Sequence, residues 1–208
     1  MKFLAHRGFW RDRAERNTLA AFQRAFDHGF GLETDVRDLA GELVISHDVP
    51  LAGAMPFADL LTMYAGSEPT LALNIKSDGL GGLLTEALAR FAPVNYFLFD
   101  MTVPQMIGLA KDHPVYYRRS EIEAQTTFPF KVGGVWLDGF WQEWWSTDLI
   151  SGLLSSGLQV AVVSPELHGR PHAEAWRRLA EAGLTDQPGL SLCTDLPMDA
   201  QSFFGGQT

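Results

Sequence analysis

The 208-residue sequence contains a single cysteine, Cys193, within the apolar segment 190–193. One cysteine cannot form an internal disulfide, so a disulfide-stapled scaffold is excluded and a buried small hydrophobic side chain is expected there. The sequence also lacks a motif typical of an activated Ser or Cys nucleophile. Any catalysis must therefore rest on other side chains.

Long apolar runs and dense basic runs are also missing. The longest apolar segments, such as 158–163, are far shorter than the roughly 20 residues that span a bilayer, and no targeting segment precedes His6. We therefore expect a soluble cytoplasmic protein without a transmembrane segment. The net charge is −9 and the only basic pairs are the arginines at 118–119 and 177–178, which argues against nucleic acid as a partner.

Hydrophobic residues make up 46% of the chain and charged residues 20%, which is typical of a folded globular protein. A chain of this length suits one domain with a substantial core, or at most two small ones. No linker rich in Pro, Gly or Ser divides the sequence. We therefore expect residues 1–208 to form a single domain.

Short apolar runs alternate with helix-length amphipathic segments along the whole chain. The expected strands are 3–5, 32–36, 71–75, 96–99, 115–117, 134–137, 160–163 and 190–193. The expected helices are 19–26, 56–65, 83–91, 104–111, 147–156 and 173–182, and residues 43–45 return from a hairpin turn at 40–42. Eight strands in alternation with helices predict a compact α/β fold, the (β/α)₈ TIM barrel, with a doubly wound open sheet as the alternative.

Polar and charged residues follow the predicted strands at their carboxyl ends. In a closed parallel barrel these ends surround one pocket, so the side chains are expected to meet there. The residues are His6, Glu33, Asp35, His47, Asn74, Asp100, Arg118, Asp138, Glu166 and Asp195.

Four of these residues suggest a particular chemistry. The imidazoles of His6 and His47 can take up and supply protons near neutral pH. Glu33 and Asp35 stand at positions i and i+2 of a strand, so both point to one side of the sheet and could hold a divalent cation. All-oxygen ligation favours Mg²⁺ or Ca²⁺. Together these groups predict metal-assisted acid–base chemistry, best suited to a phosphate ester.

Several segments resemble the motifs of glycerophosphodiester phosphodiesterases. They are residues 6–8, 17–18 with 21–22, 31–36, 41–44 and 47–48, and the match is sparser at 74–76 and 194–197. The resemblance implies a barrel independently of the strand–helix alternation. It also implies that His6 and His47 form the acid–base pair, that Glu33 and Asp35 bind the metal, and that Arg7 contacts phosphate.

The sequence departs from that family in two places. The family's third metal ligand is a glutamate two residues before a lysine, and here Asn74 precedes Lys76. An amide oxygen can still coordinate a cation, but one negative charge is lost, and Asp100 is the candidate ligand that would compensate. Arg16 stands where the family has the glutamate of a Glu-Asn-Thr element, which favours a more anionic substrate.

Other polar side chains of the expected barrel mouth are candidates for substrate binding. Lys76 and Arg118 could hold phosphate, as could His168, because late loops of barrels often bind phosphate. The aromatic cluster 140–145 could form a lid, a lipid-facing patch or a dimer interface, or simply pack under a loop. The sequence leaves the oligomeric state open.

We therefore expect a metal-dependent phosphodiester hydrolase acting on a small-molecule phosphodiester. Glycerophosphodiesters, cleaved to a phosphomonoester (glycerol phosphate) and an alcohol, fit the resemblance best. Two alternatives stay open. The substrate could be a lipid or inositol phosphodiester, as in phospholipase-like enzymes, or the barrel could bind a phosphate ligand without catalysis.

Overall fold

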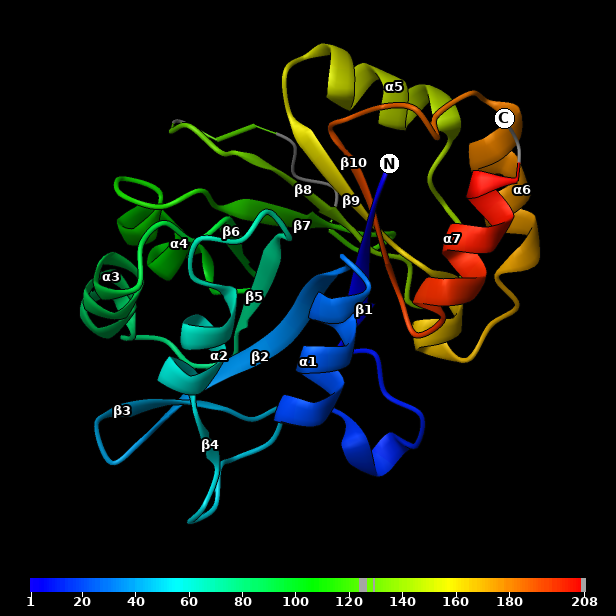
Figure 1. Ribbon diagram of the computed structural model, residues 1–208. Coiled ribbons are helices and arrows are strands. Elements are labelled where there is room, and N and C mark those ends of the chain that lie inside the picture. Colours follow the sequence, from blue (N-terminus) through cyan, green and yellow to red (C-terminus); the bar gives the residue numbers. More distant parts are fainter. Residues whose placement is uncertain (124–126, 129, 207–208) are drawn as a thin grey trace.

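The chain winds into a ring of parallel strands with the helices outside it (Figure 1). The computed structural model describes residues 1–123, 127–128 and 130–206. Its strands are β1 Lys2–His6, β2 Gly31–Leu39, β3 Glu42–Ile45, β4 Met55–Pro56, β5 Leu71–Ile75, β6 Tyr96–Phe99, β7 Tyr116–Arg119, β8 Gly134–Leu137, β9 Gln159–Val163 and β10 Leu190–Thr194. Its α-helices are α1 Leu19–Asp27, α2 Phe57–Tyr64, α3 Gly81–Arg90, α4 Val103–Leu109, α5 Thr147–Ser155, α6 Ala173–Glu181 and α7 Pro197–Gly205.

The strands close into a barrel. In the described part of the chain, β3 and β4 pair antiparallel at the end of β2, and the other strands pair in parallel in the order β7-β8-β9-β10-β1-β2-β5-β6. The two ends of this series meet where Leu98 forms a parallel bridge with Val115 and its N–H donates to the Pro114 carbonyl at 2.9 Å. The predicted (β/α)₈ barrel is therefore confirmed, and the open doubly wound sheet is not found.

Alternate residues of the strands fill the barrel interior with aromatic rings. Phe97 stacks on Tyr116 with ring centroids 3.8 Å apart, and Phe99 stacks on Trp136 at 3.9 Å. The smaller members of this inner cluster are Leu4, Ala72, Ala161, Val163 and Cys193. Cys193 is fully buried, as its sequence context predicts. The cluster forms an apolar floor beneath the carboxyl ends of the strands.

The first β-α unit shows how the sequence specifies its local structure. Thr18 begins α1 by accepting a hydrogen bond from the Ala21 N–H at 3.3 Å, as expected of a threonine at a helix N-cap. Ala21, Phe22 and Ala25 then lie on the buried face of the helix. Burial of these residues against β2 fixes the helix on the outside of the barrel.

Glycine is required at the start of β2. A Cβ added to Gly31 would lie 2.6 Å from the Leu4 side chain and 2.7 Å from the Thr70 carbonyl oxygen. Leu4 belongs to the packed interior of the barrel, so neither neighbour can move away cheaply. The glycine therefore lets β1, β2 and β5 approach closely at the amino end of the barrel.

Four elements lie outside the predicted set. They are β4, the 3₁₀ turns η1 Arg13–Glu15 and η2 Pro165–His168, and α7. The first three are too short to show a periodic pattern. Helix α7 begins at a proline, a favoured first helical residue, but buries few apolar side chains. Across the described residues, none of the helices combines the length and the apolar character that crossing a bilayer requires.

Candidate active site

Polar residues form a layer directly above the aromatic floor. Five of them lie two residues beyond a member of the inner apolar cluster, so their side chains point to the same side of the sheet. In this way His6 follows Leu4, Asn74 follows Ala72, and Arg118 follows Tyr116. Asp138 and Asp195 continue the pattern just beyond β8 and β10. The strand alternation that buries the floor therefore also directs the polar groups to one end of the barrel.

His6 is held by a carboxylate from the other end of the chain. Its Nδ1 lies 2.6 Å from Oδ1 of Asp195, and the second oxygen, Oδ2, accepts a hydrogen bond from Arg16 at 2.7 Å. An ionised carboxylate only accepts hydrogen bonds, so the proton of this contact lies on Nδ1 and leaves Nε2 free to accept one. Burial lowers the pKa of His6, against the opposing influence of Asp195.

The loop after β1 has a strained and well-defined backbone. Arg7 and Asn17 both have positive φ angles, of 56° and 57°. The Arg7 N–H donates to the Glu33 carbonyl, and its own carbonyl accepts from the Asn17 N–H, both at 2.9 Å. Gly8 follows with φ of 96°, where a Cβ would meet Ala21 at 2.7 Å. These contacts hold Arg7 and Asn17 above the end of β2.

Glu33 and Asp35 are buried side by side along β2, as their spacing predicts. Asp35 forms ion pairs with Arg7 (Nε at 3.3 Å) and Lys76 (Nζ at 3.4 Å), and it accepts a hydrogen bond from Asn17 Nδ2 at 3.0 Å. Glu33 is 3.8 Å from Nε2 of His6. Burial first, and then the charge of Asp35, raise the pKa of Glu33 to about 8, although Arg7 and Lys76 favour its charged form.

The carboxylate and amide oxygens at this place suit a hard divalent cation. Oε2 of Glu33 and Oδ1 of Asn74 are buried acceptors without a hydrogen-bond partner among the described residues. Asn74 is the register partner of Asp35 on the neighbouring strand β5. The described residues contain no cluster of three His, Cys, Asp or Glu side chains that could hold a metal, and the third oxygen beside Glu33 and Asp35 belongs to the amide of Asn74. Two carboxylates and an amide oxygen fit Mg²⁺ or Ca²⁺.

Asp100 and Arg118 form a second charged group across the barrel mouth. Arg118 donates to Asp100 Oδ1 at 2.6 Å and to both carboxylate oxygens of Glu123, at 2.6 and 3.0 Å. Lys76 lies 3.8 Å from the other oxygen of Asp100. Asp100, the candidate compensating ligand, is thus paired with two cations, and Arg118 with two carboxylates.

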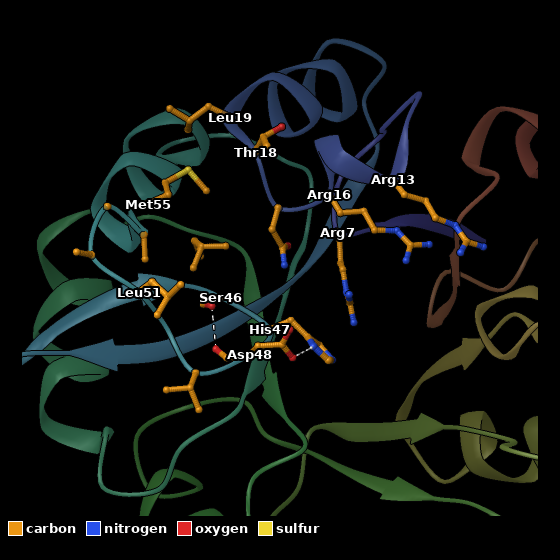
Figure 2. A pocket seen from close by; sticks show the side chains of 16 residues that line it. Arg7, Arg13, Arg16, Thr18, Leu19, Ser46, His47, Asp48, Leu51 and Met55 are labelled. Carbon is orange, nitrogen blue, oxygen red and sulfur yellow. Dashed lines mark hydrogen bonds and ion pairs between the residues drawn. The ribbon is translucent and has the colours of Figure 1, made fainter.

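His47 is not brought into contact with His6. It lies in the loop between β3 and β4, its side chain is 44% exposed, and Nδ1 pairs with Asp48 at 2.8 Å. Figure 2 shows Arg7 extending toward His47 across a cavity of about 910 Å³ that both residues line. Arg7 therefore connects this cavity to the buried carboxylates of β2.

His168 pairs with a different carboxylate. Its Nε2 lies 2.8 Å from Oδ1 of Asp138, and its ring lies against Phe140. From the aromatic cluster 140–145, Trp144 donates to the Asp138 carbonyl at 2.6 Å and Trp145 is buried, whereas Trp141 is exposed. Trp144 and Trp145 therefore anchor the loop that follows β8 to the main hydrophobic core.

Asp195 and Arg16 are the residues whose place in the site the sequence analysis did not assign. Asp195 stands out only as a polar residue after the last strand, and Arg16 only as a departure from a family motif. Their contact joins residues 179 positions apart, which no local pattern reveals. The signal that could have found Asp195 is barrel closure, since β10 pairs with β1 and must end beside His6.

No protein-family model matches the sequence, and no curated protein matches it. Solved structures do match. A protein from Galdieria sulphuraria assigned to the glycerophosphodiester phosphodiesterases superposes with a TM-score of 0.77 at 17% identity, covering 98% of this chain and 97% of that chain. The glycerophosphoryl diester phosphodiesterase from Parabacteroides distasonis gives 0.71 at 13% identity, covering 99% and 86%.

A more distant match is the Ca²⁺-dependent phosphatidylinositol-specific phospholipase C from Streptomyces antibioticus. Its TM-score is 0.53 at 11% identity, and 96% of each chain is covered. The agreement with the first two structures is closer and extends over nearly the whole of this chain. The chain thus has the fold of the glycerophosphodiester phosphodiesterases, the family that its own motifs resemble.

Proposed function

We propose that the chain is a metal-dependent phosphodiesterase that hydrolyses glycerophosphodiesters to a phosphomonoester and an alcohol. The observation that carries this proposal is that a buried imidazole–carboxylate pair lies beside a cluster of oxygen atoms able to coordinate a metal. His6 is oriented by Asp195 and approaches Glu33, while Arg7 and Lys76 lie over Asp35. The fold shared with phosphodiesterases supports it.

Each group has a physical role in this proposal. Glu33, Asp35 and Asn74 would hold Mg²⁺ or Ca²⁺, which when bound neutralises phosphate charge and stabilises the charge that develops on the phosphoryl oxygens. Arg7 and Lys76 supply donors for the same oxygens. Arg118 and His168 would contact outer parts of the substrate. Residues 1–208 would act as one domain.

The proton transfers are assigned to the two histidines. Nε2 of His6 takes a proton from the attacking group as its oxygen forms a bond to phosphorus. The attacking group is a water, or a neighbouring substrate hydroxyl that forms a cyclic phosphate, which a water then opens to the phosphomonoester. The bond from phosphorus to the alcohol oxygen breaks, and His47 supplies a proton to that oxygen. The place of His47 in the cavity wall beside Arg7 supports this role. Asp195 stabilises the protonated imidazole of His6.

The direct test is hydrolysis of glycerophosphocholine and of a bis-aryl phosphodiester with Mg²⁺, Ca²⁺, Mn²⁺ or EDTA. His6→Ala and His47→Ala are each expected to lower kcat by about 10²–10⁴. His28→Ala is the matched control, because His28 lies at the opposite end of α1 from Thr18. Folded protein that is inactive with every metal would favour a phosphate-binding barrel, and full activity in the double His variant would contradict the assigned roles.

A further inference from the structure

The cavity beside the proposed catalytic groups has two chemically different walls. One wall carries the guanidinium groups of Arg7, in the loop after β1, and Arg16, in the turn before α1. The other wall is the loop between β3 and β4 together with the start of β4, with the apolar side chains of Val49, Leu51 and Met55. Figure 2 shows Leu51 and Met55 across the cavity from the arginines. A cationic wall facing an apolar wall is suited to an amphiphile.

The apolar wall is exposed to solvent. Val49 is 78% exposed and Leu51 is 79% exposed. The backbone of their loop is shaped by other contacts: the Ser46 hydroxyl donates to the Asp48 carbonyl at 2.8 Å, and the Ala54 N–H donates to the Leu51 carbonyl at 3.1 Å. The two apolar side chains stay in solvent while these hydrogen bonds shape the loop, and covering them with an apolar ligand group would be favourable.

The cavity and the proposed phosphate site are continuous. Arg7 lines the cavity and also lies 3.3 Å from Asp35, and Asn17 lines it while donating to the same carboxylate at 3.0 Å. A volume of about 910 Å³ is within the usual range for a drug-sized ligand and exceeds what glycerol or choline would fill. A ligand bound through its phosphate at Arg7 can therefore extend along the apolar wall.

We propose that the cavity receives a single-chain amphiphilic phosphodiester, with its phosphate at Arg7 and its apolar chain against Val49, Leu51 and Met55. This inference rests on the proposed function and names the substrate class of the same site. The chain's net charge of −9 opposes adsorption to an anionic bilayer, which favours a dissolved amphiphile over a membrane surface. The bond cleaved is the same phosphodiester bond.

The first experiment compares glycerophosphocholine with short-chain lysophosphatidylcholines that remain monomeric in water. For the unmodified protein, kcat/KM is expected to rise about threefold for each added methylene until the chain outgrows the apolar wall. Val49→Ser with Leu51→Ser is expected to flatten this dependence. Ile107→Ser, at a half-exposed residue of α4, is the matched control and should leave the dependence intact.

A second measurement separates this inference from the proposed function. Calorimetric binding of the same lysophosphatidylcholines to the His6→Ala variant reports the cavity without turnover, and affinity should rise with chain length by a similar factor. Absence of hydrolysis with chain-dependent binding would refute the function and keep the amphiphile site. Hydrolysis or binding that ignores chain length would overturn the inference, as would a chain effect seen only when vesicles are added.

Discussion

Replacement of Asp195 by Asn tests whether the Asp195 carboxylate sets the imidazole tautomer of His6. Asp195 accepts from Nδ1 of His6 with one oxygen and from Arg16 with the other. Asn offers one acceptor and one donor at the same place. Arg16 can only donate, so it takes the amide oxygen, and the amide NH₂ then faces His6. The imidazole must turn to the Nε2–H form, which cannot accept a proton from a nucleophile.

The size of the effect follows from the contact. A hydrogen bond to a charged group contributes about 1.5–3 kcal/mol, which corresponds to about a 10- to 150-fold change in rate. The wrong tautomer adds to this loss, and in a catalytic triad the equivalent change costs about 10⁴-fold. We therefore expect Asp195→Asn to lower kcat by about 10²–10⁴ with little change in KM.

The double variant Asp195→Asn with Arg16→Met tests whether the Arg16 guanidinium is what turns the amide NH₂ toward His6. Without the guanidinium, the amide oxygen is free to face Nδ1 of His6, so about tenfold or more of the lost rate should return. The assay is glycerophosphocholine hydrolysis, and ¹⁵N NMR of the imidazole reports the tautomer without turnover. Asp138→Asn, in the other His–carboxylate pair, should change KM more than kcat. A double variant no better than the single one, or a proton still on Nδ1 in Asp195→Asn, would refute the argument.

Three further predictions concern packing, pH and metal. Gly31→Ala forces a Cβ into the Leu4 side chain and the Thr70 carbonyl and should lower the free energy of unfolding by about 1–3 kcal/mol in urea, whereas Gly82→Ala, at a helical residue with open space around its Cβ, should raise it by about 0.4–1 kcal/mol. Burial lowers the pKa of His113 despite Asp112, and its two ring nitrogens contact the Thr85 and Tyr96 hydroxyls. The unfolded chain therefore binds this proton better. The contribution of His113 to the free energy of unfolding should be fully present above about pH 6.5 and should fall below that pH, by at most about 1.4 kcal/mol per pH unit. His113→Gln should flatten that profile in thermal unfolding, and an unchanged profile would contradict the assignment. Asn74→Asp should lower stability in EDTA, since it buries a further carboxylate, and tighten Ca²⁺ or Mg²⁺ binding about tenfold by calorimetry; equal affinity would remove residue 74 from the metal site.

The barrel could be predicted because its signal is repeated along the chain. Strands 71–75, 96–99 and 134–137 have the bounds that the sequence indicates, since each is a short apolar run between polar turns. Glu33 and Asp35 could likewise be placed on one face, because strand alternation is a local rule. Such predictions need only the order of residues within one element.

The remaining features depend on contacts between distant segments. Asp195 meets His6 only because β10 closes the barrel against β1. The sequence suggests Asp100 as an available metal ligand, but Arg118 of the adjoining strand pairs with its carboxylate. The exposure of His47 follows from the path of the β3–β4 loop, and no periodic pattern describes a loop. Long-range closure and loop geometry thus limit what the sequence alone can predict.

The join between β6 and β7 makes the barrel unequal around its circumference. Along the described residues, these strands share the Leu98–Val115 bridge, whereas β2 and β5 stay in register over Leu32–Val36. Fewer shared hydrogen bonds imply a lower free energy of local opening at this seam. The Asp100–Arg118 ion pair spans the same seam at the mouth, so it links the carboxyl ends of β6 and β7. Any ligand group that competes for Arg118 would loosen the wall of the barrel at the point where the wall is weakest.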